Sequence, residues 1–517
     1  CEYDTTMKLP RLDLLGSTSM SVKPTRIMAH QPENNLREAT GGLSVLITIL
    51  CIVDLFGVFP VITLPKSVIT CGIYGLPLVF SVFGLQLYTA VLLGRSWLLA
   101  QEMTPNIKEK NRFPYAAVAE LAFGSPAKRL VTFLIDAAVF GSGVPNFIIA
   151  SQTLQIFWWK ISGGLVTVTY CVWMMVLALL LCPVMWLGSP KDMKPIAISS
   201  VFIVSTVAIT TWCCIIGDSV SPPPATRVAD IQPDLQDFLT AYGILAFQFD
   251  IHPMLLTLQV DMKDSRKINM AVLGGFGITA CMFAVTTMLA AMRYGPEVSS
   301  NILQTIPPSI PLYMMALLVT LQLCLSSAVS NTALFQHIED LLKVPRDFCF
   351  QRCVVRSGIL ALAIFLAESV PRFDLVMGLV GSTLTGPLMF ICPPIFFLKL
   401  CYMKSQMSDR PNLKMLNNLE YEEGDLSKSP LIAEPQIRYK TFDPAQKEDE
   451  YAVKWYDILL ALVVMTIGIF ATIIATYSSW ANSIEYATFT PPCLFNSTAA
   501  ARSKITRTTK ITVLNGP

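Results

Sequence analysis

The sequence is poor in charged side chains. Only 14% of its 517 residues are charged and 53% are hydrophobic, whereas a soluble domain has about 25% charged residues. The charged residues gather in short islands between apolar runs, and a run of about 20 apolar residues can cross a lipid bilayer as a helix. This pattern excludes an ordinary soluble domain and predicts an all-α polytopic membrane protein.

Several motifs are also missing. The sequence has no G-x-x-x-x-G-K-[ST] stretch, so an ATP-driven pump is not expected. No two of the fourteen cysteines form a C-x-x-C pair, so no metal site is indicated. The net charge of +2 comes without a basic stripe and predicts no nucleic-acid partner. We therefore expect neither an enzyme nor a cofactor-binding protein, and a gradient must supply any driving force.

Eleven stretches are candidate membrane spans. With the N-terminus in the cytosol, 29 of the 38 Lys and Arg residues fall on the cytosolic side, as the preference of basic residues for cytoplasmic loops requires. The eleven spans are 41–73, 75–94, 130–158, 165–188, 195–217, 238–260, 268–292, 311–335, 354–371, 374–398 and 455–480. The predicted parts are a disordered cytosolic tail (1–40), a ten-helix membrane core (41–400), a cytosolic loop (401–454), an eleventh helix (455–480) and a lumenal or extracellular tail (481–517).

The two ends of the chain carry further expectations. The first residue is Cys1 rather than Met, so we expect the sequence to be an N-terminally incomplete fragment. Asn496 begins the only N-x-[ST] sequon and lies in the predicted lumenal tail, so we expect it to be glycosylated.

The first and sixth spans are interrupted by proline. Pro60 has no N–H and leaves the carbonyl of Phe56 without its helical partner, and Pro253 does the same to Phe249. Such freed groups are tolerated in a bilayer only where they face protein or a water-filled cavity. One such proline more often only kinks a helix. Two breaks in corresponding spans of a five-plus-five inverted repeat, each near an acid, favour a binding site instead.

Titratable residues lie beside both breaks. Asp54 is near the first, and Asp250 and His252 are at the second. An ionised carboxylate in the middle of a bilayer is disfavoured by about 3 kcal/mol, so pairing or protonation is expected. Because an imidazole titrates near physiological pH, we predict that these three residues couple transport to an ion. A structurally satisfied histidine and an acid bonded to a neighbouring helix are the alternatives.

Two other spans contain polar residues. Asn146 follows "FGSGVP" in the third span, and the eighth span reads "CLSSAVSNTALFQ", with Ser327, Ser330 and Asn331 on two adjacent strips of one helix. The hydroxyl-rich strip could hold a cation opposite the first helix. Helix packing through small residues accounts for both segments equally well.

The chain resembles the amino acid/auxin permease family over about residues 40–480, most closely its invertebrate vacuolar-like members. The resemblance is carried by "TLPKSVITCG" at 63–72, "LGRSWLLAQE" at 93–102, "NRFPYAAVAELAFGSPAKRL" at 111–130 and "LTLQVDMKDSRKI" at 256–268. It implies eleven helices in the amino acid–polyamine–organocation fold, a five-plus-five inverted repeat plus one extra helix.

The chain departs from that family at both breaks. The family's Gly-x-Gly in the first helix aligns with Val58 and Pro60, with Gly57 as a shifted substitute, and the glycine-rich break in the sixth helix is replaced by residues 249–252. A side chain at Val58 could narrow the pocket or displace the backbone from a substrate carboxylate. The predicted substrate contacts are Gly57, Val58, Phe59, Asn146, Phe247, Gln248 and Phe249.

The leading prediction is a secondary transporter of small neutral amino acids. Protons are favoured over sodium as the coupling ion because an acid and an imidazole lie at the sixth-span break. The alternative is a non-transporting amino acid sensor that keeps the site and loses alternating access. The sequence leaves the plasma membrane and a lysosome- or vacuole-like membrane both open as the location.

Overall fold

The computed structural model describes residues 42–104, 107, 113–162, 168, 170–186, 193–219, 221, 224, 227–345, 348–370, 372–421 and 455–486. Residues 1–42 form a separate unit, of which only Gly42 is described. The predicted tail 1–40 and the sequon at Asn496 therefore lie outside the described residues. Everything below concerns the unit that begins at Leu43.

The described residues are mostly helical, and their single β-bridge joins Leu43 to Met262. Eight helical stretches are long and apolar enough to cross a membrane: Gly72–Met103, Ser125–Trp159, Ala197–Ile216, Ser265–Arg293, Ile310–Leu341, Phe350–Ser369, Phe373–Gln406 and Trp455–Ile484. Each coincides with a predicted span. The other three predicted spans, 41–73, 165–188 and 238–260, contain shorter helices.

The helices follow one another in a simple order. The first half contains α2 (Val45–Phe56), α3 (Phe59–Ile62), α4 (Leu64–Thr70), α5 (Gly75–Met103), α6 (Pro114–Phe123), α7 (Ser125–Ile161), α8 (Tyr170–Trp186) and α9 (Met193–Ile216). The second half contains α10 (Leu235–Gln248), α11 (His252–Asp261), α12 (Ile268–Arg293), α13 (Ile302–Thr305), α14 (Ile310–Leu341), α15 (Phe350–Ser369), α16 (Phe373–Val380), α17 (Cys392–Tyr421) and α18 (Trp455–Tyr486).

Both proline-containing spans are interrupted where the sequence predicts. α2 ends at Phe56, and Gly57 has φ +60° and ψ −149°, a conformation that is essentially restricted to glycine. Pro60 then lies in the first turn of α3. In the sixth span, residues 249–251 separate α10 from α11, and Pro253 lies in the first turn of α11. Each proline thus starts a new helix, because its missing N–H has no partner to lose in a first turn.

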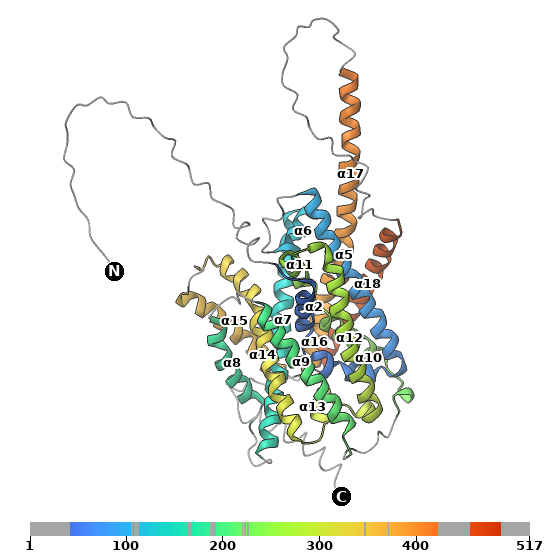
Figure 1. Cartoon of the computed structure of the whole chain (residues 1–517). Helices are drawn as coiled ribbons and strands as arrows, with labels where there is room; N and C mark the ends of the chain where they lie inside the picture. Colours follow the sequence, from blue (N-terminus) through green and yellow to red (C-terminus); the bar gives the residue numbers. More distant parts are fainter. Residues whose placement is uncertain are drawn as a thin grey trace, which may run out of the picture. The chain divides into compact units, whose positions relative to one another are not determined.

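The long helices enclose these breaks. α14 packs along α7 and α9, and α2 packs against α9 and α12, so that α2 lies within the bundle (Figure 1). α10 packs against α5, α16 and α18. The interrupted segments are therefore surrounded by protein, as freed backbone groups in a membrane require.

The tenth predicted span has irregular geometry. α16 continues into α17 through two π-helical segments, η6 (Gly381–Thr385) and η7 (Pro387–Ile391). A Cβ at Gly381 would lie 1.9 Å from the carbonyl oxygen of Gly243, so η6 approaches α10 at backbone contact. π-helical turns often mark functional sites.

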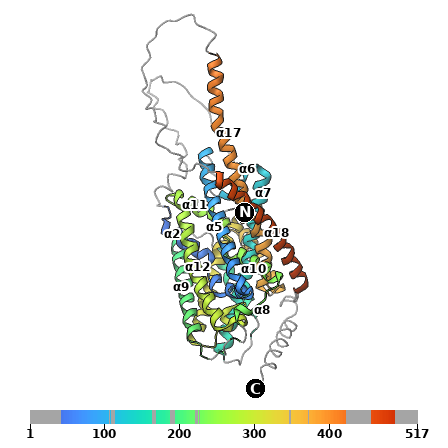
Figure 2. The ribbon, with the colours of Figure 1, turned by 90° about the vertical axis from the view of Figure 1, so that its right-hand side faces the viewer.

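The last helices differ in one respect from the predicted boundaries. α17 continues to Tyr421, into the range 401–454 that the sequence predicts as a loop, and residues 422–454 lie outside the described part of the chain. α18 lies obliquely along the bundle against α10, α16 and α17 (Figure 2).

Candidate functional site

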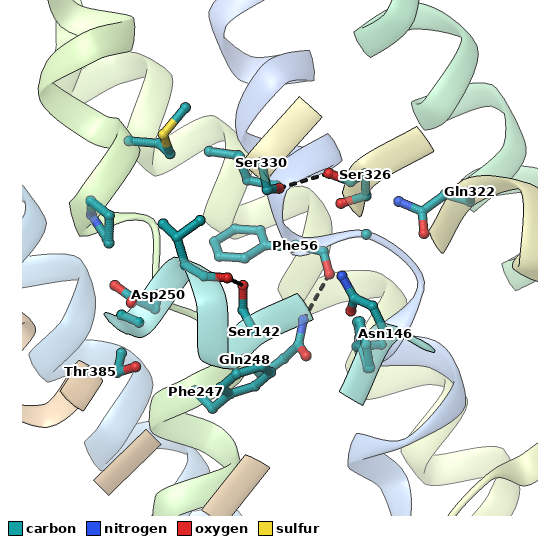
Figure 3. A pocket seen from close by; sticks show the side chains of 17 residues that line it. Phe56, Ser142, Asn146, Phe247, Gln248, Asp250, Gln322, Ser326, Ser330 and Thr385 are labelled. Atoms are coloured by element: carbon teal, nitrogen blue, oxygen red, sulfur yellow. Dashed lines mark hydrogen bonds between the residues drawn. The ribbon is translucent and has the colours of Figure 1, made fainter. Parts of the chain in front are cut away.

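A cavity of about 110 Å³ lies between the two broken helices (Figure 3). Asp250 is the one charged residue among the described residues that line it. The remaining lining residues come from both broken helices, from α7 and α14, and from η6. They are Leu55, Phe56, Gly57, Phe59, Ala138, Val139, Ser142, Asn146, Phe247, Gln248, Pro253, Met254, Gln322, Ser326, Ser330 and Thr385.

Most of the predicted substrate contacts line this cavity. Gly57, Phe59, Asn146, Phe247 and Gln248 all do so. The two exceptions, Val58 and Phe249, are almost completely buried and are not among the lining residues. Val58 therefore does not narrow the cavity directly.

The predicted coupling residues divide differently. Asp250 and Ser330 line the cavity, whereas Asp54, His252, Ser327 and Asn331 do not. Their roles stay predictions, but the geometry separates residues that a ligand can touch from residues that can act only through a neighbour.

The first break is tied to the sixth helix by a side chain. The carbonyl oxygen of Phe56, which Pro60 deprives of its helical partner, accepts a hydrogen bond from Nε2 of Gln248 at 2.7 Å. Only the amide nitrogen can donate to a carbonyl, so this bond fixes the orientation of the carboxamide. Gln248 thus links the end of α10 to the end of α2.

Asp54 points to a neighbouring helix. Its carboxylate lies next to the side chain of Ser200 on α9, and Ser200 accepts a weak bond from Nε2 of Gln322 at 3.4 Å. Gln322 lines the cavity and lies so close to Gly57 that a Cβ there would be 2.9 Å from its Nε2. Asp54 therefore reaches the cavity only through Ser200 and Gln322.

The second break holds an acid against an imidazole. Oδ1 of Asp250 accepts a hydrogen bond from the backbone N–H of His252 at 3.2 Å, and it lies 3.6 Å from the Nδ1 atom of the same residue. On an intact helix these two side chains would point about 200° apart. The unwound residues before Pro253 are what bring them together, and Thr385 lies beside Asp250 (Figure 3).

His252 lies behind Asp250 as seen from the cavity. Its side chain has no exposed surface, and its Nε2 atom lies 3.1 Å from the hydroxyl of Thr89 on α5. The pair therefore presents its carboxyl group to the cavity and keeps its imidazole in the protein.

A cluster of aromatic rings packs around the two breaks. Phe249 packs edge-on against Phe56, with ring centroids 5.5 Å apart, and against Phe83 at 5.2 Å. Phe56 and Phe83 both contact the ring of Phe276 on α12. Edge-to-face ring pairs are favourable beyond their burial, so this cluster holds the end of α2 against residue 249.

The polar residues of the third and eighth spans mainly bond to each other. Nδ2 of Asn146 donates to the hydroxyl of Ser327 at 3.1 Å, and Nδ2 of Asn331 donates to the backbone carbonyl of Ser327 at 2.8 Å. The first bond joins α7 to α14, and the second lies within α14. Of the four predicted residues in these spans, Asn146 and Ser330 line the cavity.

Four polar lining residues are not among the predicted site residues. Ser142 and Ser326 lie in the polar segments of the third and eighth spans, whereas Gln322 and Thr385 lie outside them. Gln322 precedes Ser326 by four residues and Ser330 by eight, so all three follow one strip of α14. That spacing could have identified Gln322. Thr385 has no comparable signal, because its position depends on the π-helical turns of η6.

A second acid–imidazole pair lies outside the cavity. Asp136 on α7 is hydrogen-bonded to Nδ1 of His337 near the end of α14, and the ring of Phe113 packs against His337. No group of three or more His, Cys, Asp or Glu side chains within the described ranges is arranged to hold a metal ion.

Known proteins match this chain over the region that contains the site. Residues 43–419 match the family described as transmembrane amino acid transporter protein. Amino acid transporter AVT1B of Arabidopsis thaliana is 21% identical over 406 residues, which are 76% of this chain and 71% of that protein. Sodium-coupled neutral amino acid transporter 4 of Homo sapiens is 27% identical over 170 residues, 31% of each chain.

A solved protein structure has a similar fold. The fold of this chain is similar to the crystal structure of MhsT in complex with L-phenylalanine, with a TM-score of 0.50 and 13% identity over 85% of this chain and 99% of that one. At this identity the likeness concerns the fold alone. The family match covers most of the chain, including both broken helices and every residue that lines the cavity. The resemblance seen in the sequence is confirmed, and the chain belongs to the transmembrane amino acid transporter family.

Proposed function

We propose that this protein is a secondary transporter that moves small neutral amino acids together with protons by alternating access. The observation that carries the proposal is the pair of breaks. Two interrupted helices, each restarted by a proline, border one cavity enclosed by α7 and α14. Paired interruptions of this kind bring helix ends and unpaired backbone groups to a substrate site.

The size of the cavity favours a small substrate. At about 110 Å³ it is smaller than the engineered cavity of about 150 Å³ that accommodates benzene. Three phenylalanine residues, Phe56, Phe59 and Phe247, line the cavity of this protein. We expect glycine, alanine and serine to fit, and phenylalanine to be excluded.

The charge of the lining residues favours a neutral amino acid. Asp250 supplies the one carboxylate, and the described lining residues include no Lys or Arg. An acidic substrate would bring a second negative charge into a low-dielectric site, where like charges repel strongly. The ammonium group of a neutral amino acid meets no such obstacle.

The coupling ion follows from the second break. Asp250 lines the cavity and faces His252, so a proton that reaches the cavity can bind there. Relatives named as sodium-coupled match about a third of the chain, and sodium is therefore the competing ion. The imidazole distinguishes the two, because its nitrogen can bind a proton, whereas hard cations such as sodium prefer oxygen ligands.

The proposed architecture extends the helices seen here. Eight apolar helices together with α2–α4, α8 and the α10–α11 pair make eleven crossings, and the breaks in the first and sixth relate the two halves as an inverted repeat. The N-terminus is cytosolic in this arrangement, in agreement with the distribution of Lys and Arg.

Uptake by the full chain reconstituted in proteoliposomes tests the proposal. Labelled alanine should accumulate when the outside is acidic relative to the interior, and a sodium gradient at equal pH should not replace the pH gradient. Excess unlabelled glycine or serine should compete, whereas phenylalanine and aspartate should not. Saturable alanine binding without uptake under any gradient would contradict transport and support a sensor.

A further inference from the structure

The hydroxyl of Thr89 lies between a backbone carbonyl and the ring of His252. This hydroxyl has a single hydrogen, which it donates to the carbonyl oxygen of Gln86 at 3.1 Å. The same oxygen lies 3.1 Å from Nε2 of His252, and both side chains are completely buried. While Thr89 donates its hydrogen to Gln86, it can only accept from the ring, and Nε2 then carries the hydrogen.

This tautomer leaves the other ring nitrogen as an acceptor. A neutral imidazole has one N–H, so Nδ1 of His252 is bare. Nδ1 has no hydrogen-bond partner among the described residues, and it faces Oδ1 of Asp250 at 3.6 Å, which is longer than a hydrogen bond. When Asp250 is ionised and His252 is neutral, two acceptor atoms, Oδ1 and Nδ1, therefore face each other.

We propose that Thr89 is a positioning residue that holds His252 in the Nε2–H tautomer, so that Asp250 and His252 together bind one proton in each transport cycle. One proton between Oδ1 and Nδ1 turns two opposed acceptors into a donor and an acceptor, whichever atom carries it. The proton enters and leaves through Asp250, which lines the cavity. This inference rests on the proton coupling proposed above.

Few other groups can compete for that proton. Of the elements that pack against α11, α6 presents Tyr115, whose hydroxyl is buried and donates to the carbonyl of Leu388 at 2.6 Å. The 3₁₀ helix η4 (Ser265–Lys267) carries Arg266 and Lys267, but it lies at the far end of α11. The described residues of η7 include no titratable side chain.

The charged groups of α5 pair elsewhere, Arg95 with Asp457 and Glu102 with Lys404. On α5, the hydroxyl of Tyr88 is directed to α18, where it reaches the carbonyl of Asp457 at 3.5 Å. The residues that line the cavity around Asp250 carry no second titratable side chain. The proton is therefore assigned to Asp250 and His252.

The test replaces the hydroxyl without changing the shape of the side chain. Thr89→Val removes the acceptor for Nε2–H, so the ring can adopt the Nδ1–H tautomer and donate to the ionised Asp250. That hydrogen bond stabilises the deprotonated state of Asp250 and His252. The variant should therefore bind the proton less tightly than the wild type. The pH at which alanine uptake into proteoliposomes is half-maximal should move lower by about 0.5–1 unit, the shift expected from one neutral hydrogen bond.

Thr89→Ser is the matched control, because it keeps the hydroxyl and loses only a methyl group. It should retain the wild-type midpoint, and alanine exchange at equal pH should persist in both variants, which shows that they are folded. If Thr89→Val and Thr89→Ser have the same midpoint, whether or not it differs from the wild type, the positioning role of Thr89 is overturned. The proposed proton coupling is not affected by that result. Wild-type uptake that does not depend on pH would overturn the proton coupling as well.

Discussion

At the two breaks, unusual backbone geometry decides which side chains reach the cavity. Gly57 adopts a conformation that a side chain cannot share without strain, and it lies against the carboxamide of Gln322. Asp250 lines the cavity because the unwound backbone turns it there, away from the direction that a continuous helix would impose. These positions depend on residue identity more strictly than the apolar walls do.

Gly57→Ala tests the first break. The change should destabilise the protein by about 1–3 kcal/mol through its φ and ψ angles, and the new Cβ, 2.9 Å from Nε2 of Gln322, should displace that side chain. Alanine uptake in proteoliposomes should fall at least tenfold. Gly277→Ala is the control, because its Cβ would meet nothing within 4 Å. Equal uptake in the two variants would show that the conformation of Gly57 is not needed.

At the scale of elements, the two broken helices are joined to each other. Gln248 of α10 bonds the carbonyl that Pro60 frees in the first span, and Phe249 packs against the ring of Phe56. These two contacts connect the ends of the broken helices directly. α7 and α14 are joined separately through Asn146 and Ser327.

Gln248→Met tests this connection. It keeps much of the side-chain volume but leaves the buried carbonyl of Phe56 without its bond, which should cost about 1–3 kcal/mol. Both thermal stability and alanine binding should decrease. Gln259→Met is matched to it, because Gln259 is also fully buried and donates to the carbonyl of Gly94 at 3.0 Å, but it does not line the cavity. Gln259→Met should lose stability, but the folded variant should keep its affinity for alanine. If Gln248→Met and Gln259→Met lose the same affinity, Gln248 has no special role in the site.

At the scale of the whole molecule, local sequence patterns predict some features of the fold and not others. Eight of the spans and both breaks could be predicted, because apolar length and the missing N–H of proline act locally. The partner of the freed carbonyl, Gln248, is 192 residues away from Phe56, and no local pattern indicates it. No local pattern indicates that Asp54 lies beside Ser200 either, because the rotation of α2 about its axis is set by packing against α9 and α12.

The orientation of this multi-pass membrane protein is testable at the same scale. We expect a cytosolic N-terminus and a lumenal or extracellular C-terminus, because most Lys and Arg residues then lie in cytosolic loops. Glycosidase should increase the gel mobility of the expressed protein, and Asn496→Gln should abolish that change. Cleavage of residues 490–517 by a protease added to the cytosolic face of sealed vesicles would contradict this topology.

The central claim is that Asp250 and His252 at the second break couple a proton to substrate movement. Its most direct measurement compares pH-driven accumulation of alanine with alanine exchange at equal pH, in proteoliposomes that contain wild-type protein, Asp250→Asn or His252→Gln. Both substitutions keep side-chain size and hydrogen-bonding capacity. We predict that accumulation driven by the pH gradient falls at least tenfold in both variants while exchange persists. Accumulation with unchanged pH dependence in both variants would contradict the account.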